Sequence, residues 1–335
     1  MTSNTRRLVA LAALPILLLL AGRAGAEDTL RLATFNCEFL VRTKVHVKFG
    51  LDFDPNKWTP EQKAQWEQPG FRDARFSEAA KTVATVIHKI NADVIALCEV
   101  GVDADVQQLR QEVAALGLTY PHAAVCESAD TVTGQHVAVL SKRPFESIIQ
   151  TIPGRETYDR ELDDPETEDD TSISKGMQVV FRAANQPIHL FVVHLASERG
   201  GHEQDAQRIA QASIARRNYL EPLNKGEHVI VAGDLNDYRG QPTIRRIRGQ
   251  DDIYPDLIQT GLAAYFPPDK LDTRWTFEFQ GERMQIDHVL PSQSIKEACK
   301  HGGIRAEVVP VTERIMGTDH LASDHRAFVV TLEFK

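Results

Sequence analysis

Short apolar runs typical of strands alternate along the chain with segments whose apolar residues have helical spacing. Short apolar runs rich in β-branched residues, as expected of buried strands, recur along the sequence. They lie at 29–36, 93–100, 122–128, 136–142, 177–183, 188–196, 228–236, 275–279, 284–290 and 327–334. Helical spacing runs through 77–90, with Ser77 as the expected N-cap, and through 103–116. Strands and helices that alternate in this way predict an α/β fold.

Two segments interrupt this pattern. Residues 41–75 contain Trp58, Trp66 and three prolines, and they are longer than an ordinary connection between a strand and a helix. Residues 155–172 carry nine acidic residues against two arginines, which predicts a solvated loop without the spacing of a calcium-binding loop. Because no Gly/Ser linker divides the rest, we expect one catalytic domain over 27–335.

Residues 1–26 have the pattern of a secretory signal peptide. Arg6 and Arg7 precede an uncharged apolar run over 8–21, and the segment ends in Ala-Gly-Ala. A membrane anchor is the alternative, but the run is shorter than the ~20 residues that span a bilayer. We therefore expect cleavage after Ala26, export to the periplasm or the extracellular space, and no stable membrane anchor.

Charge and cysteine content exclude several classes of protein. The net charge is −9, and loss of the three arginines in residues 1–26 takes it to −12. A broad basic surface for nucleic acid is therefore excluded, whereas a carboxylate site that binds divalent cations is compatible with this charge. The four cysteines form no CxxC pair, which excludes a zinc finger or a thioredoxin-like motif. We expect buried free thiols, with one disulfide as the alternative.

Several apolar runs end in, or are preceded by, carboxylate, amide or imidazole side chains. These residues are Asn36, Glu38, Glu99, His194, Asp234, Asn236, Asp287, His288, Asp324 and His325. A single polar strand end is ordinary, because strands commonly finish in solvent or in a satisfied hydrogen bond. So many ends of the same chemical character indicate side chains that converge at one edge of a sheet.

These residue types suit the hydrolysis of a phosphate ester. Glu38 and Glu99 offer the oxygen ligands that Mg²⁺ prefers. Asp234 can orient an attacking water and take its proton. A carboxylate such as Asp287 raises the pKa of a partner such as His325, which then stays cationic and can stabilise charge in the transition state.

Six motifs, in this order, resemble the endonuclease/exonuclease/phosphatase superfamily, whose members have the DNase I-like fold. They are TFNCE (34–38), DVIALCEV (93–100), VVHLAS (192–197), GDLND (233–237), QIDHVL (285–290) and SDHRAF (323–328). The resemblance spans about 29–334. It implies a four-layer α/β/β/α sandwich of two packed mixed sheets, with the site at one end.

The resemblance also implies a role for each matching residue. The implied metal ligands are Glu38, Glu99 and Asp324, and the implied catalytic residues are His194, Asp234, Asn236, Asp287 and His325. The implied substrate-binding residues are Asn36, Asn236 and His194. Mg²⁺ is the implied cofactor, with Mn²⁺ and Ca²⁺ as alternatives. By contrast, we expect His288 to point to the opposite face of its strand, and Lys175, Arg208 and Arg274 to be surface ion-pair partners.

We therefore expect an exported, divalent-metal-dependent phosphoesterase that acts as a monomer without a protein partner. The first expectation is a phosphodiesterase or nuclease that hydrolyses nucleic acid. The alternative is a phosphatase or a phospholipase C-like enzyme acting on inositol phosphates or sphingolipids. It is disfavoured because we find neither an extended apolar hairpin nor a basic run before MQIDHVL. A catalytically dead binding scaffold is a third alternative, and the retained acids and histidines argue against it.

Overall fold

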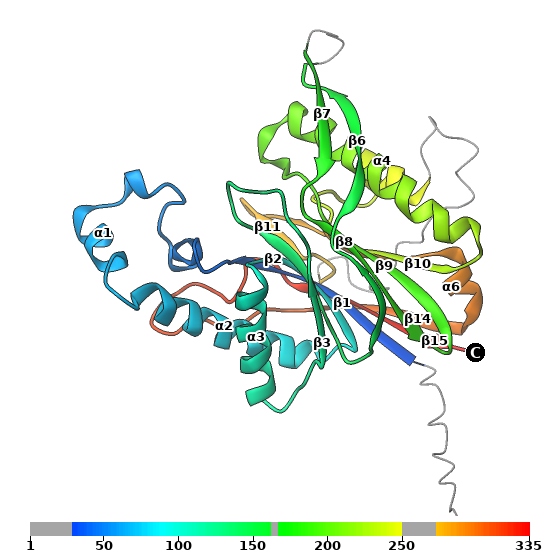
Figure 1. The fold of residues 1–335 in the computed structure, drawn as a ribbon, viewed down its shortest axis with the longest axis horizontal. Helices are drawn as coiled ribbons and strands as arrows, with labels where there is room; N and C mark the ends of the chain where they lie inside the picture. Colours follow the sequence, from blue (N-terminus) through cyan, green and yellow to red (C-terminus); the bar gives the residue numbers. More distant parts are fainter. Residues whose placement is uncertain (1–28, 162–166, 250–272) are drawn as a thin grey trace, which may run out of the picture.

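Two mixed β-sheets face each other, and helices cover the outer face of each sheet (Figure 1). The computed structural model describes residues 29–161, 167–249 and 273–335. The six-stranded sheet has the order β14-β15-β1-β2-β4-β3, and the five-stranded sheet has the order β13-β10-β9-β8-β5. The predicted four-layer α/β/β/α sandwich is thereby confirmed.

The strands of the six-stranded sheet are β1 (Thr29–Leu40), β2 (Val94–Val100), β3 (His122–Val125), β4 (His136–Ser141), β14 (Cys299–Val309) and β15 (Ala327–Phe334). Those of the five-stranded sheet are β5 (Phe145–Ile149), β8 (Gly176–Ala183), β9 (Gln186–His194), β10 (His228–Asp234) and β13 (Asp287–Pro291). The helices are α1 (Pro60–Trp66), α2 (Phe71–Ile90), α3 (Asp103–Ala115), α4 (His202–Asn224), α5 (Pro242–Arg248) and α6 (Gln293–Ala298). The short 3-10 helices are η1 (Val45–Phe49), η2 (Pro55–Lys57) and η4 (Glu198–Gly200).

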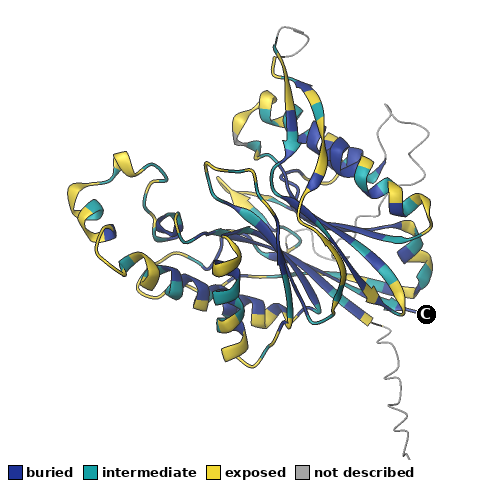
Figure 2. Ribbon diagram, in the orientation of Figure 1, coloured by how far each residue is buried: buried dark blue, intermediate teal, exposed yellow. Residues whose placement is uncertain are grey.

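Neighbouring residues of the central strands pack into different apolar layers, as the two-residue period of a strand requires. In β2, Val94 and Ala96 lie between the sheets, whereas Ile95 and Leu97 pack toward α2 and α3. In β10 the same alternation separates the layer between the sheets from the layer under α4. Three apolar layers therefore join the four layers of secondary structure, and Figure 2 shows buried residues along the strands.

Strand register brings the polar strand ends to one edge of the sandwich. The parallel pair β1 and β2 places Asn36 beside Cys98, and the parallel pair β9 and β10 places His194 beside Asp234. Strand β13 runs antiparallel to β10, so its first residue, Asp287, lies opposite Asp234. Polar residues that are far apart in the sequence thus meet because their strands end at the same level.

The backbone is irregular where the site residues leave the sheets. Glu38, Glu99 and Asn236 have φ values of 45°, 57° and 49°, in the left-handed region that residues other than glycine seldom adopt. The pairing of β1 with β2 shifts register between Asn36 and Leu40, as a β-bulge does. Such local strain commonly occurs at functional sites, where the surrounding structure holds it in place.

In its described residues, 155–161 and 167–172, the acidic segment is a β-hairpin, so the prediction of a loop is wrong there, whereas most of its side chains are exposed or partly exposed, as predicted. Residues 162–166 lie outside the described residues. The hairpin pairs β6 (Ile152–Asp159) with β7 (Glu168–Ile173), packs against α4 and projects from the sandwich (Figure 1). Ile152 and Ile173 are buried in the apolar layer under α4, and Arg217 of α4 forms an ion pair with Glu156. Arginines and two buried isoleucines thus order a segment whose charge suggested disorder.

Helix α2 begins six residues earlier than predicted, at Phe71 with Gly70 as its N-cap, so the assignment of Ser77 as the N-cap is wrong. The added turn is stabilised by aromatic packing, because Phe71 lies edge-on against Trp66 with ring centroids 5.3 Å apart. The preceding segment is not one long loop: it contains η1, η2 and α1.

All four cysteines are free and buried, as predicted, so the alternative of a disulfide is not realised. Within the described residues, no helix has the length and the apolar character needed to cross a membrane. The expected signal peptide over 1–26 lies outside the described residues and stays a prediction.

Candidate active site

The polar strand ends border a cavity of about 510 Å³. Its polar lining includes Glu38, Glu99, Lys175, His194, Glu198, Asp234, Asn236, Asp324 and His325. Its apolar wall includes Phe39, Val47, Leu195, Phe277, Phe279, Met284 and Ile286. A concave site of this size, with convergent polar groups on one side and an apolar wall on the other, is typical of a small-molecule or active site.

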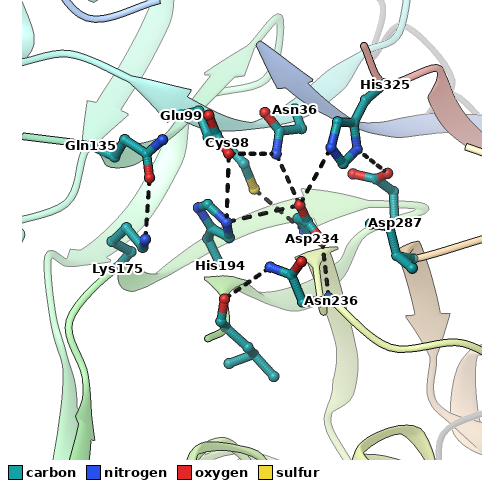
Figure 3. Close-up of polar contacts among 12 residues, drawn as sticks. Asn36, Cys98, Glu99, Gln135, Lys175, His194, Asp234, Asn236, Asp287 and His325 are labelled. Atoms are coloured by element: carbon teal, nitrogen blue, oxygen red, sulfur yellow. Dashed lines mark hydrogen bonds and ion pairs between the residues drawn. The ribbon is translucent and has the colours of Figure 1, made fainter. Parts of the chain in front are cut away.

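Asp234 lies at the centre of the polar group (Figure 3). Its Oδ2 accepts a hydrogen bond from Asn36 Nδ2 at 2.9 Å, and its Oδ1 accepts one from the backbone N–H of Asn236 at 2.9 Å. Its own backbone N–H points to Cys98 Sγ at 3.4 Å, on the facing sheet. Burial and then the nearby Asp287 carboxylate raise the pKa of Asp234 to about 7.

Asn36 holds two carboxylates in place, and it is fully buried behind the cavity wall. Its Nδ2 donates to Asp234 and also to Glu99 Oε1 at 3.1 Å, while its Oδ1 accepts from the backbone of Glu38 at 2.9 Å. Both amide hydrogens are therefore used within the protein. These contacts indicate a positioning role for Asn36, and direct substrate binding by Asn36 stays a prediction.

His325 and Asp287 form a buried pair across the two sheets. The carboxylate Oδ2 of Asp287 lies 2.8 Å from His325 Nδ1. Burial alone would lower the pKa of His325, but the charge and hydrogen bond of Asp287 hold it well above its usual range. The other ring nitrogen, Nε2, lies 3.9 Å from an oxygen of Asp234 and faces the cavity. The imidazole is therefore a cation next to the central carboxylate.

Two hydroxyl groups hold this pair in position. Ser323 Oγ donates to the backbone carbonyl of Asn36 at 2.7 Å and accepts from the backbone N–H of His325 at 3.0 Å. Thr276 Oγ1 accepts from the backbone N–H of Asp287 at 3.1 Å. Sequence reasoning did not single out either residue, although Ser323 lies within the SDHRAF motif.

The pKa of His194 is shifted in the opposite direction to that of His325. Its Nε2 lies 3.8 Å from Glu99 Oε1 and 3.8 Å from Asp234 Oδ2, which is too far for a hydrogen bond. Burial, and then the charge of Lys175, hold the pKa of His194 well below its usual range. One histidine of the site is therefore neutral and the other is cationic at neutral pH.

The donor atoms fit a hard divalent cation. Two clusters in the described residues have donor atoms within 4.8 Å of one another: Glu99, His194 and Asp234, and Asp234, Asp287 and His325. Glu38 and Asp324 line the same cavity outside both clusters, and the Asp324 side chain is 43% exposed. Burial raises the pKa of Glu38, and the charge of Asp324 adds to this effect. Carboxylate oxygens are the ligands that Mg²⁺ prefers, and Glu38, Glu99, Asp234 and Asp324 all line this cavity.

Lys175 was predicted to be a surface ion-pair partner, but it lines the cavity. Its ammonium group is largely buried and lies 3.2 Å from Gln135 Oε1 and 3.4 Å from Asp130 Oδ2. Arg208 is an ion-pair partner of Asp205, as expected, but it is buried rather than on the surface.

A strand was predicted over 275–279, but its contact with the site was not. β11 (Phe277–Phe279) and β12 (Glu282–Met284) pair beside the site, and the Phe277 ring stacks on that of His325 with centroids 4.7 Å apart. Apolar runs in the sequence gave no sign of this contact, because it depends on tertiary structure. His288 points away from the cavity, as predicted, and contacts the backbone carbonyl of Asp237 at 2.8 Å.

Comparison with known proteins identifies the family of the chain. Residues 33–325 match the model of the Endonuclease/Exonuclease/phosphatase family. No curated protein sequence matches the chain. Among solved structures, truncated TDP2 from Caenorhabditis elegans is 16% identical, with a TM-score of 0.54, over 92% of this chain and 98% of that chain.

Two further structures share the fold. A double mutant of beta toxin from Staphylococcus aureus with bound magnesium ions is 15% identical, with a TM-score of 0.56, over 90% of this chain and 98% of that chain. Sphingomyelinase C from Streptomyces griseocarneus is 18% identical, with a TM-score of 0.52, over 91% of this chain and 99% of that chain. Identities this low show the fold alone. The match to the family model covers most of the sequence, and the chain belongs to the endonuclease/exonuclease/phosphatase family.

Proposed function

We propose that this protein is an exported, Mg²⁺-dependent phosphodiesterase that hydrolyses nucleic acid. The observation that carries the proposal is the convergence of Asp234 with Asn36 and Glu99 on one side and the Asp287–His325 pair on the other. A base, a cation and a set of metal-binding oxygens in one cavity are the groups that phosphoester hydrolysis requires. Export is proposed from the sequence of residues 1–26.

Asp234 is the group best placed to take a proton from the attacking water. A pKa of about 7 makes its carboxylate an effective base near neutral pH. Hydrogen bonds from Asn36 and from the backbone of Asn236 occupy both carboxylate oxygens and set their direction. As the water oxygen bonds to phosphorus, its proton passes to Asp234. The ester P–O bond breaks on the opposite side, its electron pair stays on the leaving oxygen, and that oxygen takes a proton from solvent to leave as an alcohol.

The positive groups of the cavity stabilise the phosphate. Protonated His325 donates through Nε2 to a phosphoryl oxygen, while Asp287 keeps the ring charged and correctly turned. Asn236 uses one amide hydrogen on the carbonyl of Leu195 at 3.0 Å, which leaves the other for a phosphoryl oxygen. The ammonium of Lys175 lies on the cavity wall and adds a second fixed positive charge.

Glu38, Glu99 and Asp324 would hold the divalent cation, whose charge neutralises the phosphate and favours the ionised form of nearby carboxylates. The backbone N–H of Phe39 donates to Glu99 Oε2 at 2.9 Å, so one oxygen of this ligand is already oriented.

The substrate class is inferred from the apolar wall. Phe277 and Phe279 stack almost parallel, with ring planes 9° apart, and Phe279 is 44% exposed. Aromatic rings beside a phosphate-binding group provide a surface on which nucleobases stack, which is worth about 1–3 kcal/mol per base. The same exposed ring favours a second candidate, a phospholipase C-like enzyme, because an exposed aromatic side chain can also contact lipid.

A substrate panel tests the proposed function. Purified protein with Mg²⁺ is incubated separately with single-stranded oligonucleotide, plasmid DNA, an inositol polyphosphate and sphingomyelin vesicles, and Asp234→Asn is run alongside. We expect cleavage of nucleic acid by the wild type only. Release of phosphate or phosphocholine, with intact nucleic acid, would replace the substrate and keep the chemistry. No turnover on any substrate would favour a binding scaffold instead.

Metal binding gives a second prediction. At a free Mg²⁺ concentration of 100 times Kd, the thermal midpoint of the wild type should rise by roughly 5 °C over the chelated protein, because binding stabilises only the folded state. Glu99→Gln should remove most of this rise, whereas Glu198→Gln, on the same cavity but outside both clusters, should keep it. Differential scanning calorimetry measures both. Equal shifts in all three proteins would contradict the assigned ligand.

A further inference from the structure

Lys48 of η1 is a charged residue with almost no exposure to solvent, and it does not line the cavity. Its ammonium nitrogen donates to three backbone carbonyls: Cys37 at 2.8 Å, Glu38 at 2.8 Å and Ala322 at 2.7 Å. An ammonium group has three hydrogens, so these three acceptors satisfy all of them. The side chain carboxylate of Glu38 lies at 3.5 Å and supplies an opposing charge.

A buried ammonium group is costly to desolvate, and an apolar side chain at this position would avoid that cost. The contacts of Lys48 show which groups its charge stabilises. Two of its acceptors belong to the β1 bulge, where Glu38 has a φ of 45°, and the third immediately precedes the turn of Ser323, Asp324 and His325. The ammonium group thus joins the two backbone segments that carry Glu38 and Asp324.

A second contact links the same segments, because Ser323 Oγ donates to the carbonyl of Asn36. The hydrogen bond of Ser323 holds the 322–325 turn to β1 at Asn36, before the bulge. Lys48 holds the same turn to β1 at Cys37 and Glu38, within the bulge. Without Lys48, three buried carbonyls would lose their donor, and the strained conformation at Glu38 would lose its support. The backbone segments that carry Glu38 and Asp324 would then no longer be held together by this ammonium group.

We propose that Lys48 is a positioning residue for the divalent cation: it holds the backbone of Glu38 and of the 322–325 turn so that Glu38 and Asp324 can bind the ion together. This rests on the metal site of the proposed function. A purely electrostatic role would have the opposite sign, because an ammonium group near the acids repels a cation. The direction of the change in metal affinity therefore separates positioning from charge.

The test measures Mn²⁺ binding to the full chain by isothermal titration calorimetry, without substrate. We expect Lys48→Met to raise the Kd for Mn²⁺ about tenfold, because the carboxylates must be ordered before they bind. Glu38→Gln should raise Kd in the wild-type background but have much less effect in the Lys48→Met background, since residues that act through one another are not additive. Lys44→Met is the matched control: it removes a charge from the same turn, where the ammonium lies 4.1 Å from the centre of the Phe53 ring, and should leave Kd unchanged.

An unchanged or lower Kd in folded Lys48→Met, or additive effects of the two substitutions, would overturn the proposal. If Lys48→Met does not fold, Lys48→Gln keeps a donor for part of the carbonyl cluster, and we expect the same weakening of Mn²⁺ binding. Unchanged binding there would likewise overturn the proposal. Failure of the proposed function is distinguishable, because the wild type would then show neither Mn²⁺ binding nor turnover.

Discussion

Replacing His325 by asparagine should reduce kcat by about 10²–10⁴-fold while the protein stays folded, as expected on losing a positioned acid or cation. The asparagine amide can still donate to Asp287, because its Nδ2 takes the place of the ring Nδ1 that lies 2.8 Å from that carboxylate. The group lost is Nε2, which faces the cavity. Steady-state kinetics on the substrate found in the panel, with circular dichroism as a check of folding, measure the effect.

The matched control is His320→Asn, a change of the same type at an exposed histidine on the preceding segment, and it should leave kcat unchanged. The pH profile adds a second readout. Because Asp287 raises the pKa of His325, activity should persist above pH 6.5 and fall as the ring loses its proton on the alkaline side. Asp287→Asn should move that alkaline limb to lower pH. An unmoved limb, or a His325→Asn variant with wild-type kcat, would remove His325 from the mechanism.

Gly233→Ala should lower the free energy of unfolding by roughly 3 kcal/mol, one of the largest losses available to a single methyl group in this fold. Gly233 has a φ of 140°, and a Cβ placed there would lie 1.9 Å from the backbone carbonyl oxygen of Val193 on β9. Backbone atoms of a central strand cannot move aside as a flexible side chain can. Urea denaturation, compared at equal m-values, gives the change.

The control for this substitution is Gly226→Ala. Gly226 also has a positive φ, 79°, but a Cβ there meets no atom within 4 Å, so only the backbone penalty of about 1 kcal/mol is expected. The difference between the two variants isolates the steric clash. Equal losses would mean that β9 and β10 can separate at this point without cost. Because Val193 precedes His194 and Gly233 precedes Asp234, activity should fall together with stability.

Much of the architecture follows from the sequence because the central strands are continuous apolar runs, as expected of strands buried on both faces. The runs in 93–100 and 228–236 place apolar residues on both faces, and in the structure these residues separate into different apolar layers. The motifs also identified the residues at the strand ends, because parallel strands that end in polar side chains bring them to one edge. The structure of the acidic segment was predicted least well. Nothing local distinguishes the ordered β6–β7 hairpin from a solvated acidic loop.

The parts of the site that could not be predicted are held by tertiary contacts. Lys48 lies in an ordinary stretch of sequence, and its role depends on carbonyl groups of Cys37, Glu38 and Ala322, whose direction no side-chain pattern reveals. The motif identified Asn36, but it did not show that both amide hydrogens of Asn36 bind carboxylates of the protein. Residue types predict what chemistry a side chain can do, whereas burial and hydrogen bonds decide which of those options remain.

Two hydrogen bonds of the site join segments that belong to different sheets. Asn36 of β1 donates to Asp234 of β10, and Asp287 of β13 binds His325, which lies two residues before β15. The spacing of the two sheets, set by the apolar layer between them, is therefore also the spacing of the reacting groups. Larger side chains at interior positions between the sheets, such as Ala96 and Ala232, should therefore change the spacing of these groups without touching them. A set of core substitutions that preserves the free energy of unfolding would still change the rate of catalysis. Fewer core substitutions should therefore preserve activity than preserve stability.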